Sequence, residues 1–189
     1  MPNLNTARGA IDTTDLGVTL MHEHVFIMTT EVLENYPEGW GDESKRIADA
    51  VARLNELKSR GVDLSRVVIG HSGDTTDLDY LEELIRNGSY IGMDRFGIDV
   101  YLPFEDRVET VARMCERGHA DKMVLSHDAS CYFDALPEET LPVALPNWHY
   151  LHIHNDVIPA LKERGVPYEQ LTTMLVDNPR KIFETQGGY

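Results

Sequence analysis

The stretch Gly17-Val-Thr-Leu-Met-His-Glu-His-Val-Phe26 is a short apolar run that closes on two histidines one residue apart. The run predicts a β-strand over residues 17–26. Side chains alternate between the two faces of a strand, so His22 and His24 would leave the same face near its end. Two imidazoles placed in this way can bind one divalent ion from one side, and the alternative is two unrelated histidines at a strand end. Further metal ligands elsewhere in the chain would favour the metal site over two unrelated histidines.

The bulk composition is that of an ordinary soluble domain. The 189 residues suffice for one domain with a sizeable core, and they are 42% hydrophobic and 26% charged. The net charge of −15 would repel a phosphate backbone, so nucleic acid and anionic membranes are not expected partners. The sequence contains neither a run of membrane-span length nor a signal-peptide core. Two cysteines are too few for a disulfide framework, and we expect a cytoplasmic protein.

Three further apolar runs follow, each of strand length and continuous in apolar residues, as is typical of strands buried on both faces. They cover residues 66–70, 89–93 and 122–126. Helical spacing of apolar residues is found at 43–60, 78–85, 105–117, 155–164, 169–175 and 179–185, and a long loop is expected over 129–150. This alternation predicts an α/β fold with a parallel sheet covered by helices.

Ionisable residues follow the C-terminal end of every predicted strand. His22 and His24 close the first strand, and the other three are followed by His71, by Asp94-Arg95 and by His127-Asp128. Sites in α/β proteins are built at this edge of the sheet, because the loops that follow the strands converge there. The repeated placement therefore predicts one constellation of side chains.

Two or three histidines with a carboxylate are the ligand set of a hydrolytic zinc-type site. A bound metal lowers the pKa of its water to about 7. Asp128 could bind the metal and also take a proton, while Arg95 or Asp94 could orient a substrate. Structural alternatives remain for each residue: His71 can lie at a capped helix start, Asp128 can make a loop hydrogen bond, and Arg95 can pair with a neighbouring carboxylate.

Three other histidines are predicted to be structural. His127 is adjacent to Asp128, so strand alternation points it toward the helices. His152 and His154 run directly into a helical pattern that we expect to be capped by Asn155 or Asp156.

Five motifs in order resemble the phosphotriesterase family of the amidohydrolase superfamily. They are Gly17-Val-Thr-Leu-Met-His-Glu-His24, Val68-Ile-Gly-His-Ser-Gly-Asp74, Gly92-Met-Asp-Arg95, Val124-Leu-Ser-His-Asp128 and Asp177-Asn-Pro-Arg-Lys-Ile-Phe183. The stretch Gly92-Met-Asp-Arg-Phe-Gly97 and the long loop after Asp128 are most similar to the phosphotriesterase-like lactonases.

The resemblance implies a TIM barrel, (β/α)8, with two metal ions bridged by hydroxide at its C-terminal face. Carried over by motif, His22, His24 and Asp128 would hold the first metal, for which Zn²⁺ is the expected ion, and His71 would hold the second. Asp128 would also shuttle the proton, and Arg95 would lie on the leaving-group side. A lactone or an organophosphate is the implied substrate.

This chain departs from the family pattern in its middle. A TIM barrel takes about 250 residues, and only four strands can be placed here. The family's strands 2 to 5 have no counterpart in this chain. The carboxylated lysine that bridges the two metals in the family has no counterpart either. The chain is therefore predicted to be a truncated barrel of about four parallel βα units, a single partial domain over 1–189 with an internal junction near 61–63.

The retained strands correspond to strands 1, 6, 7 and 8 of the family, which would be neighbours in a closed barrel. A half barrel exposes two edges, so two chains could close one barrel as a homodimer. The expected function is a metal-dependent lactonase or phosphotriesterase impaired by the missing segment, with one metal ion or none. The alternatives are a non-catalytic zinc-binding or oligomerising remnant and a partial version of a longer enzyme.

Overall fold

The computed structural model describes residues 2–6, 9–22, 24–27, 52, 55–56, 59, 64–133 and 139–184. For residues 6, 24–27 and 131–133 it describes the backbone alone. Within these ranges no helix is long and apolar enough to cross a membrane.

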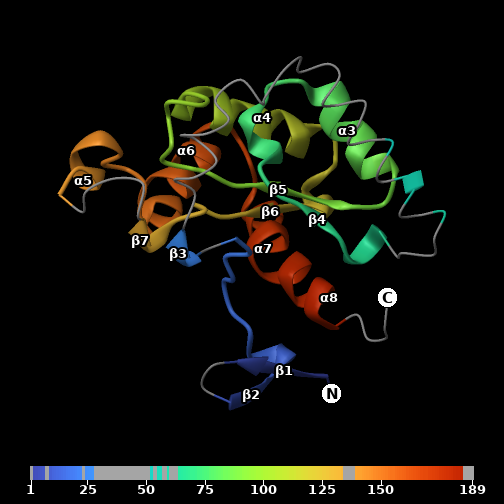
Figure 1. Ribbon diagram of the computed structural model, residues 1–189. Helices are drawn as coiled ribbons and strands as arrows, with labels where there is room; N and C mark the ends of the chain where they lie inside the picture. The colour runs from blue at the N-terminus through green and yellow to red at the C-terminus, as the bar shows by residue number, and fades with distance from the viewer. Residues whose placement is uncertain are drawn as a thin grey trace.

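A three-stranded parallel sheet, with the order β4-β5-β6, forms the centre of the molecule (Figure 1). Its strands are β4 (Val68–Ile69), β5 (Tyr90–Met93) and β6 (Met123–Leu125). A second parallel pair joins β3 (His24–Ile27) to β7 (Ser130–Phe133). Just before this pair, the amide of Asp128, in the segment between β6 and β7, donates to the carbonyl of His22 at 2.9 Å. The predicted α/β fold with a parallel sheet is confirmed.

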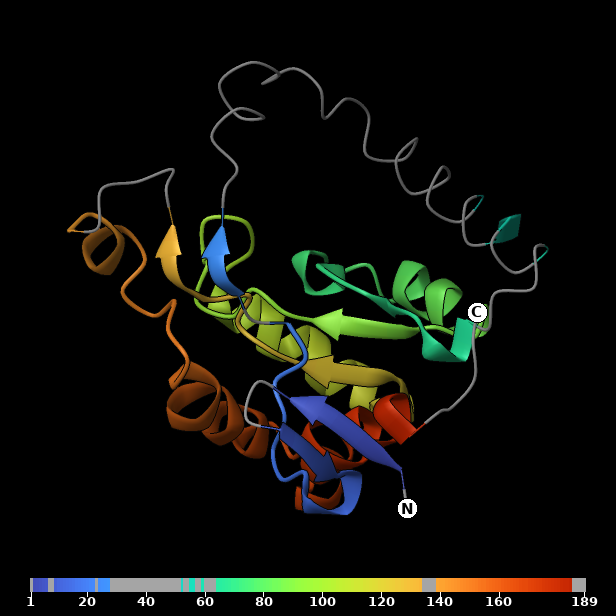
Figure 2. The ribbon, with the colours of Figure 1, turned by 60° about the horizontal axis from the view of Figure 1, so that its bottom comes forward.

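Helices pack against this sheet, and they alternate with its strands along the chain. The helices α3 (Leu78–Arg86) and α4 (Phe104–Glu116) lie along one side, with α6 (Ile158–Glu163) beside α4 (Figures 1 and 2). Two further helices complete the C-terminal part, α7 (Tyr168–Thr172) and α8 (Asn178–Glu184). Short 3-10 turns occupy 13–15, 64–66, 72–74 and 120–122.

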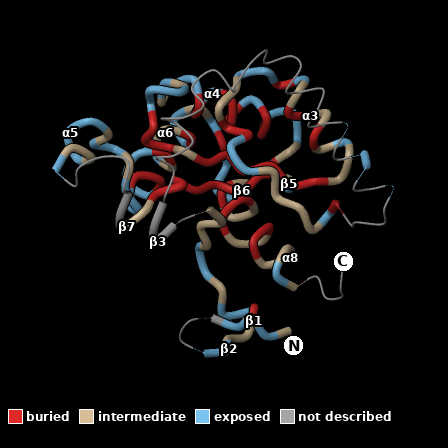
Figure 3. Tube along the Cα trace, viewed as in Figure 1, coloured by how far each residue is buried: buried red, intermediate tan, exposed pale blue. Residues whose placement is uncertain are grey.

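The hydrophobic core lies between the sheet and these helices, where the buried segments of Figure 3 gather. Ile91 and Met93, two residues apart on β5, both belong to it, as do Met123 and Leu125 on β6. Residues two apart share one face of a strand, so both strands turn these side chains toward the helices. The helices contribute a large set: Leu81, Leu84, Val108, Val111, Met114, Val157, Leu161 and Met174.

The helices predicted at 78–85 and 105–117 are confirmed as α3 and α4. Asp77 caps α3, since its Oδ1 accepts the amide of Tyr80 at 3.0 Å. The predicted helix 43–60 lies mostly outside the described residues; positions 52, 55–56 and 59 are helical.

The strand predicted over 17–26 is wrong at its first residues, because β3 begins only at His24. The amide of Thr19 bonds instead to the carbonyl of Leu175 at 2.8 Å, so this part of the segment contacts the C-terminal helices. Other elements went unpredicted. They are the antiparallel hairpin β1 (Asn3–Thr6) with β2 (Gly9–Asp12), and β7 and α5 (Leu141–Ala144) within the expected long loop.

The C-terminal helices differ from prediction in their continuity. A π-helical segment, Ile153–Val157, runs straight into α6, and a second, Thr173–Asp177, joins α7 to α8. A proline follows each segment at the second position, Pro159 and Pro179. Proline lacks an amide hydrogen and crowds the preceding turn, and a wide π-turn accommodates it without ending the helix. The predicted break between 169–175 and 179–185 therefore does not occur.

Candidate metal centre

Three strand-end residues share an unusual backbone conformation. His71, Arg95 and Asp128 follow β4, β5 and β6, and their φ angles are 59°, 62° and 56°. A residue other than glycine in this left-handed region costs about 1–3 kcal/mol, and it persists where the surrounding structure holds it. Such residues are common at functional sites, so the backbone conformation indicates a site at this edge of the sheet.

Asp94, the first residue after β5, joins two of the histidines. Its carboxylate is fully buried, with Oδ2 2.8 Å from Nδ1 of His22 and Oδ1 3.2 Å from Nδ1 of His71. The backbone amide of His71 also donates to Oδ2 at 2.9 Å. One carboxylate therefore orients both imidazoles and the loop that carries one of them.

The charge of Asp94 is maintained by these contacts. Burial alone would raise the pKa of its carboxyl, but the hydrogen bonds from His22 and His71 lower the pKa to about 2. A carboxylate only accepts hydrogen bonds, so Nδ1 of His22 carries the proton and Nε2 is the nitrogen suited to a metal. Gly92 makes room for this carboxylate, since a Cβ there would lie 3.0 Å from Oδ2 of Asp94.

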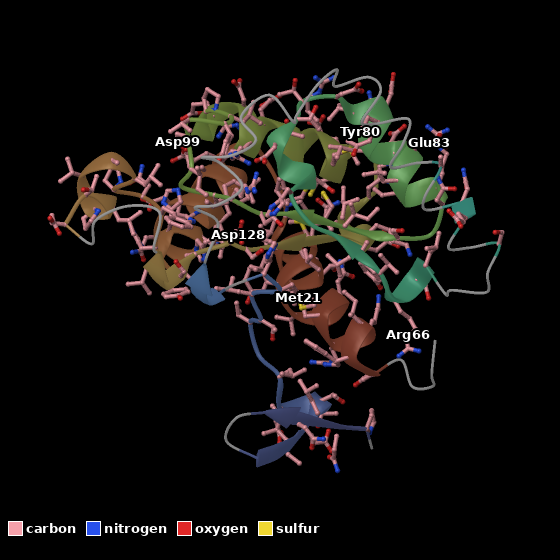
Figure 4. The ribbon with its side chains drawn as sticks, in the orientation of Figure 1. Met21, Arg66, Tyr80, Glu83, Asp99 and Asp128 are labelled. Carbon is pink, nitrogen blue, oxygen red and sulfur yellow. The ribbon has the colours of Figure 1, made fainter. Side chains whose placement is uncertain are left out.

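Asp128 faces the same histidines from the end of β6. Its Oδ1 lies 3.1 Å from Nε2 of His22, and its Oδ2 lies 3.6 Å from Nδ1 of His71. The centroids of the two imidazole rings are 5.0 Å apart. Figure 4 shows Asp128 between the end of β6 and the segment with Met21 that leads into β3.

The gathered residues fit a divalent cation. His22, His71 and Asp94 each offer a ligand atom, and these atoms all lie within 4.8 Å of one another. No other group of three or more such residues is found among the described positions. Two imidazoles and a carboxylate form a donor set of the kind used by hydrolytic zinc sites.

Arg95 links this cluster to a second carboxylate. Its Nε donates to Oδ2 of Asp128 at 3.3 Å, and its Nη1 donates to Oδ2 of Asp74 at 2.6 Å. The guanidinium also lies 5.0 Å from the ring centroid of Tyr101. The expected pairing of Arg95 with a neighbouring carboxylate is therefore present, and it holds Arg95 against Asp128.

The structure thus brings together four of the five predicted site residues, namely His22, His71, Arg95 and Asp128. The fifth, His24, pairs through its backbone with Ser130, and its side chain lies outside the described residues. Sequence reasoning missed Asp94 as the residue that orients both histidines. The available signal was its position directly after a strand, as for the others.

The remaining histidines agree in part with prediction. His127 is fully buried and points away from the cluster, with its Nε2 accepting the amide of Ile153 at 2.9 Å. His152 is buried as well, and its Nδ1 lies 2.8 Å from Oδ2 of Asp156. The predicted cap at Asn155 or Asp156 is wrong, because the helix already includes Ile153.

A family model described as the phosphotriesterase family matches residues 2–63 and 57–183. The chain belongs to the phosphotriesterase family. This confirms the resemblance drawn from the motifs, and the solved structures of the family provide the comparison for this fold.

A phosphotriesterase homology protein of Mycobacterium tuberculosis is 47% identical over 325 aligned positions that cover all of both chains. The structure of the phosphotriesterase from Mycobacterium tuberculosis matches with a TM-score of 0.81 and 47% identity, again over 100% of both chains. The alignment has 325 positions and this chain has 189 residues, which leaves at least 136 positions without a residue here.

Other family members match over a shorter part. The aryldialkylphosphatase of Saccharolobus solfataricus is 42% identical over 130 residues, which are 67% of this chain and 41% of that protein. A variant of a phosphotriesterase-like lactonase from Deinococcus radiodurans has 36% identity and a TM-score of 0.63, over 70% of this chain and 43% of that one. This chain therefore spans about two fifths of the length of these relatives.

Proposed function

We propose that this chain is a metal-dependent hydrolase with His22, His71 and Asp128 as metal ligands and Asp94 as the residue that orients the histidines. The observation that carries the proposal is the position of the Asp128 carboxylate between the two histidines, with Oδ1 3.1 Å from Nε2 of His22 and Oδ2 3.6 Å from Nδ1 of His71, after the end of a parallel strand. His24 is proposed as a further ligand from its motif alone.

Zinc is the proposed metal because two imidazoles and carboxylate oxygens suit it. When bound, a divalent cation would supply an acidified water and polarise the substrate oxygen. Asp128 can take the proton of that water, since its carboxylate lies at the cluster and accepts from Nε of Arg95 at 3.3 Å. Arg95 holds Asp128 in place and offers positive charge toward the leaving group.

Lactones and phosphotriesters are the proposed substrates. The names of the aryldialkylphosphatase and of the phosphotriesterase-like lactonase support these two classes. Among the described residues, no lysine at the C-terminal end of a strand could be the bridging lysine implied by the family resemblance, because Lys122 lies before β6. We therefore propose one metal ion per chain rather than two, and an activity impaired by the missing strands.

Hydrolysis assays on both substrate classes test this function. We expect the zinc-loaded protein to hydrolyse a lactone or an aryl phosphotriester, and to lose that activity with a chelator. Asp128→Asn should lower the rate by about 10²–10⁴-fold, the typical contribution of a general base. Asp99→Asn, an exposed change in the loop after β5, serves as the matched control. A chelator-resistant rate, or an unchanged rate in Asp128→Asn, would refute the proposal.

A non-catalytic zinc-binding or oligomerising remnant is the second candidate. It is favoured by the alignment, in which at least 136 positions of the relative face no residue of this chain. In this case zinc raises the melting temperature while lactone and phosphotriester hydrolysis stay at the rate without protein. The two candidates thus differ in turnover and agree in metal binding.

We also propose that the chain joins two parts of the family fold near residues 61–63. The two stretches matched by the family model overlap at 57–63, which supports a junction there. Strands 1, 6, 7 and 8 of the barrel would remain, and two copies could complete eight strands as a homodimer. Light scattering that gives the mass of a single 21.4 kDa chain at all concentrations would exclude this assembly.

A further inference from the structure

Arg107 is an arginine inside the protein core. It lies on α4, it is 1% exposed, and it is among the largest fully buried side chains of the described residues. A charged group is rarely buried to this extent, because removal from water costs several kcal/mol unless its charge and its donors are matched. The groups that contact its guanidinium therefore indicate the role of Arg107.

The three nitrogens of this guanidinium make four hydrogen bonds and one ion pair to two loops. Nε donates to the carbonyl of Leu102 at 3.1 Å, and Nη1 donates to the carbonyls of Gly73 at 2.8 Å and Asp94 at 3.2 Å. Nη2 donates to the carbonyl of Ile98 at 3.4 Å and lies 2.7 Å from Oδ1 of Asp74. The planar fork of arginine suits such a set of acceptors.

These acceptors come from the two loops that carry the metal-centre residues. Gly73 and Asp74 follow His71 after β4, and the carbonyl of Asp94 lies directly after β5. Asp74 in turn accepts from Arg95 through its other oxygen at 2.6 Å. Arg107 thus contacts the backbone of both loops. It also ends a row of alternating charges, in which Asp74 lies between Arg107 and Arg95.

We infer that Arg107 is a positioning residue, which fixes the loop after β4 against the loop after β5 and thereby sets the distance between His71 and Asp94. Its described polar contacts are with backbone carbonyls and with the carboxylate of Asp74. The metal-related part of this inference rests on the proposed function; the loop-positioning part does not.

Lysine cannot take over this role, although it keeps the charge. Its ammonium has three donors at one point and cannot reach five acceptors spread over a plane. Arg107→Lys is therefore the informative variant. Arg113→Lys is the matched control, since Arg113 is an exposed arginine on the same helix.

Amide hydrogen exchange tests the positioning directly. The amide of His71 donates to Asp94 at 2.9 Å across the two loops, whereas the amide of Tyr90 donates to Val67 at 2.9 Å beside the β4–β5 ladder. In metal-free Arg107→Lys we expect exchange at His71 to be about tenfold faster or more, with Tyr90 much less affected. The zinc dissociation constant should rise by about 10–100-fold. Arg113→Lys should match the wild type in both measurements.

Unchanged exchange at His71 in a folded Arg107→Lys protein would overturn the inference. A wild-type chain that binds no zinc would refute the proposed function and leave the exchange measurement decisive for Arg107. Should Arg107→Lys fail to fold, the side-chain N–H resonances of Arg107 in the wild type give the answer. Slow solvent exchange relative to Arg113 supports the inference, and equal exchange of the two guanidinium groups overturns it.

Discussion

At the scale of residues, Asp94 organises the candidate centre. It is buried, it bonds the Nδ1 atoms of His22 and His71, and it accepts the amide of His71. These contacts leave the outer nitrogen of His22 toward Asp128, which is the arrangement expected of a carboxylate behind a metal-binding histidine.

The variant Asp94→Asn should weaken zinc binding by about 10–100-fold, the usual effect of removing an outer-shell partner. The two imidazoles contact different oxygens of Asp94, so an amide would present an NH2 donor to one of them. Zinc affinity measured by competition with a chromophoric chelator checks this, with Asp99→Asn as an exposed control from the same loop. A dissociation constant within twofold of the wild type would contradict the assigned role of Asp94.

The backbone at His71 provides a second test at this scale. At a φ of 59° a residue with a Cβ, such as alanine, is disfavoured relative to glycine. The free energy of unfolding of His71→Gly should therefore exceed that of His71→Ala by about 1 kcal/mol. Urea denaturation of the two metal-free variants measures the difference, and both lack the imidazole equally. A more stable alanine variant would show that the strained conformation is absent.

The residues of the site were predictable to different extents. Three of them follow apolar strands, namely His71, Arg95 and Asp128. This placement alone predicted that they lie at one edge of the sheet. The role of Asp94 depends on a contact with His22 across 72 positions, which no local pattern encodes. Likewise, the burial of Arg107 could not be read from an arginine in an otherwise charged helical turn.

At the scale of elements, helices with clear end signals were predicted within one residue. Asp77 caps the start of α3, and Gly88 and Gly118, both at positive φ, follow the ends of α3 and α4. The segment before β3 was not predictable, because Thr19 bonds to Leu175 in the C-terminal helices. The π-turns also lack a sequence pattern beyond the prolines that follow them.

The buried face of α4 can be tested through Cys115. Burial raises the pKa of this thiol to about 12, so at pH 8 it stays protonated in the folded protein. A thiol reagent should therefore leave Cys115 unmodified until the chain unfolds, in a Cys131→Ser background that removes the other cysteine. The stability that burial of the neutral thiol contributes is kept below pH 9 and declines as the pH rises toward 12. Modification at the rate of an exposed thiol would contradict the packing of α4.

At the scale of the whole molecule, the α/β class followed from the alternation of apolar runs and helical patterns. The truncated barrel remains a proposal, because the apolar runs predicted four strands but not the assembly in which the edges of those strands would be paired. Metal binding should be a large part of the stability of such a shortened fold, since the proposed ligands His22, His71 and Asp128 are far apart in the sequence.

Zinc should accordingly raise the melting temperature. At about 100 times its dissociation constant a ligand adds about 2.7 kcal/mol, which corresponds to a shift of about 5–10 °C for a domain of this size. Thermal unfolding followed by circular dichroism, with and without zinc, measures this shift. The variant His22→Ala should remove it, and an equal shift in His22→Ala would place the zinc elsewhere.

The zinc content of the purified chain shows whether His22 and His71 belong to one metal centre. After equilibration with zinc and removal of the free ion, we expect about one zinc per chain, falling close to zero in the double variant His22→Ala/His71→Ala. A wild-type chain without zinc, or a double variant that retains the wild-type content, would contradict it.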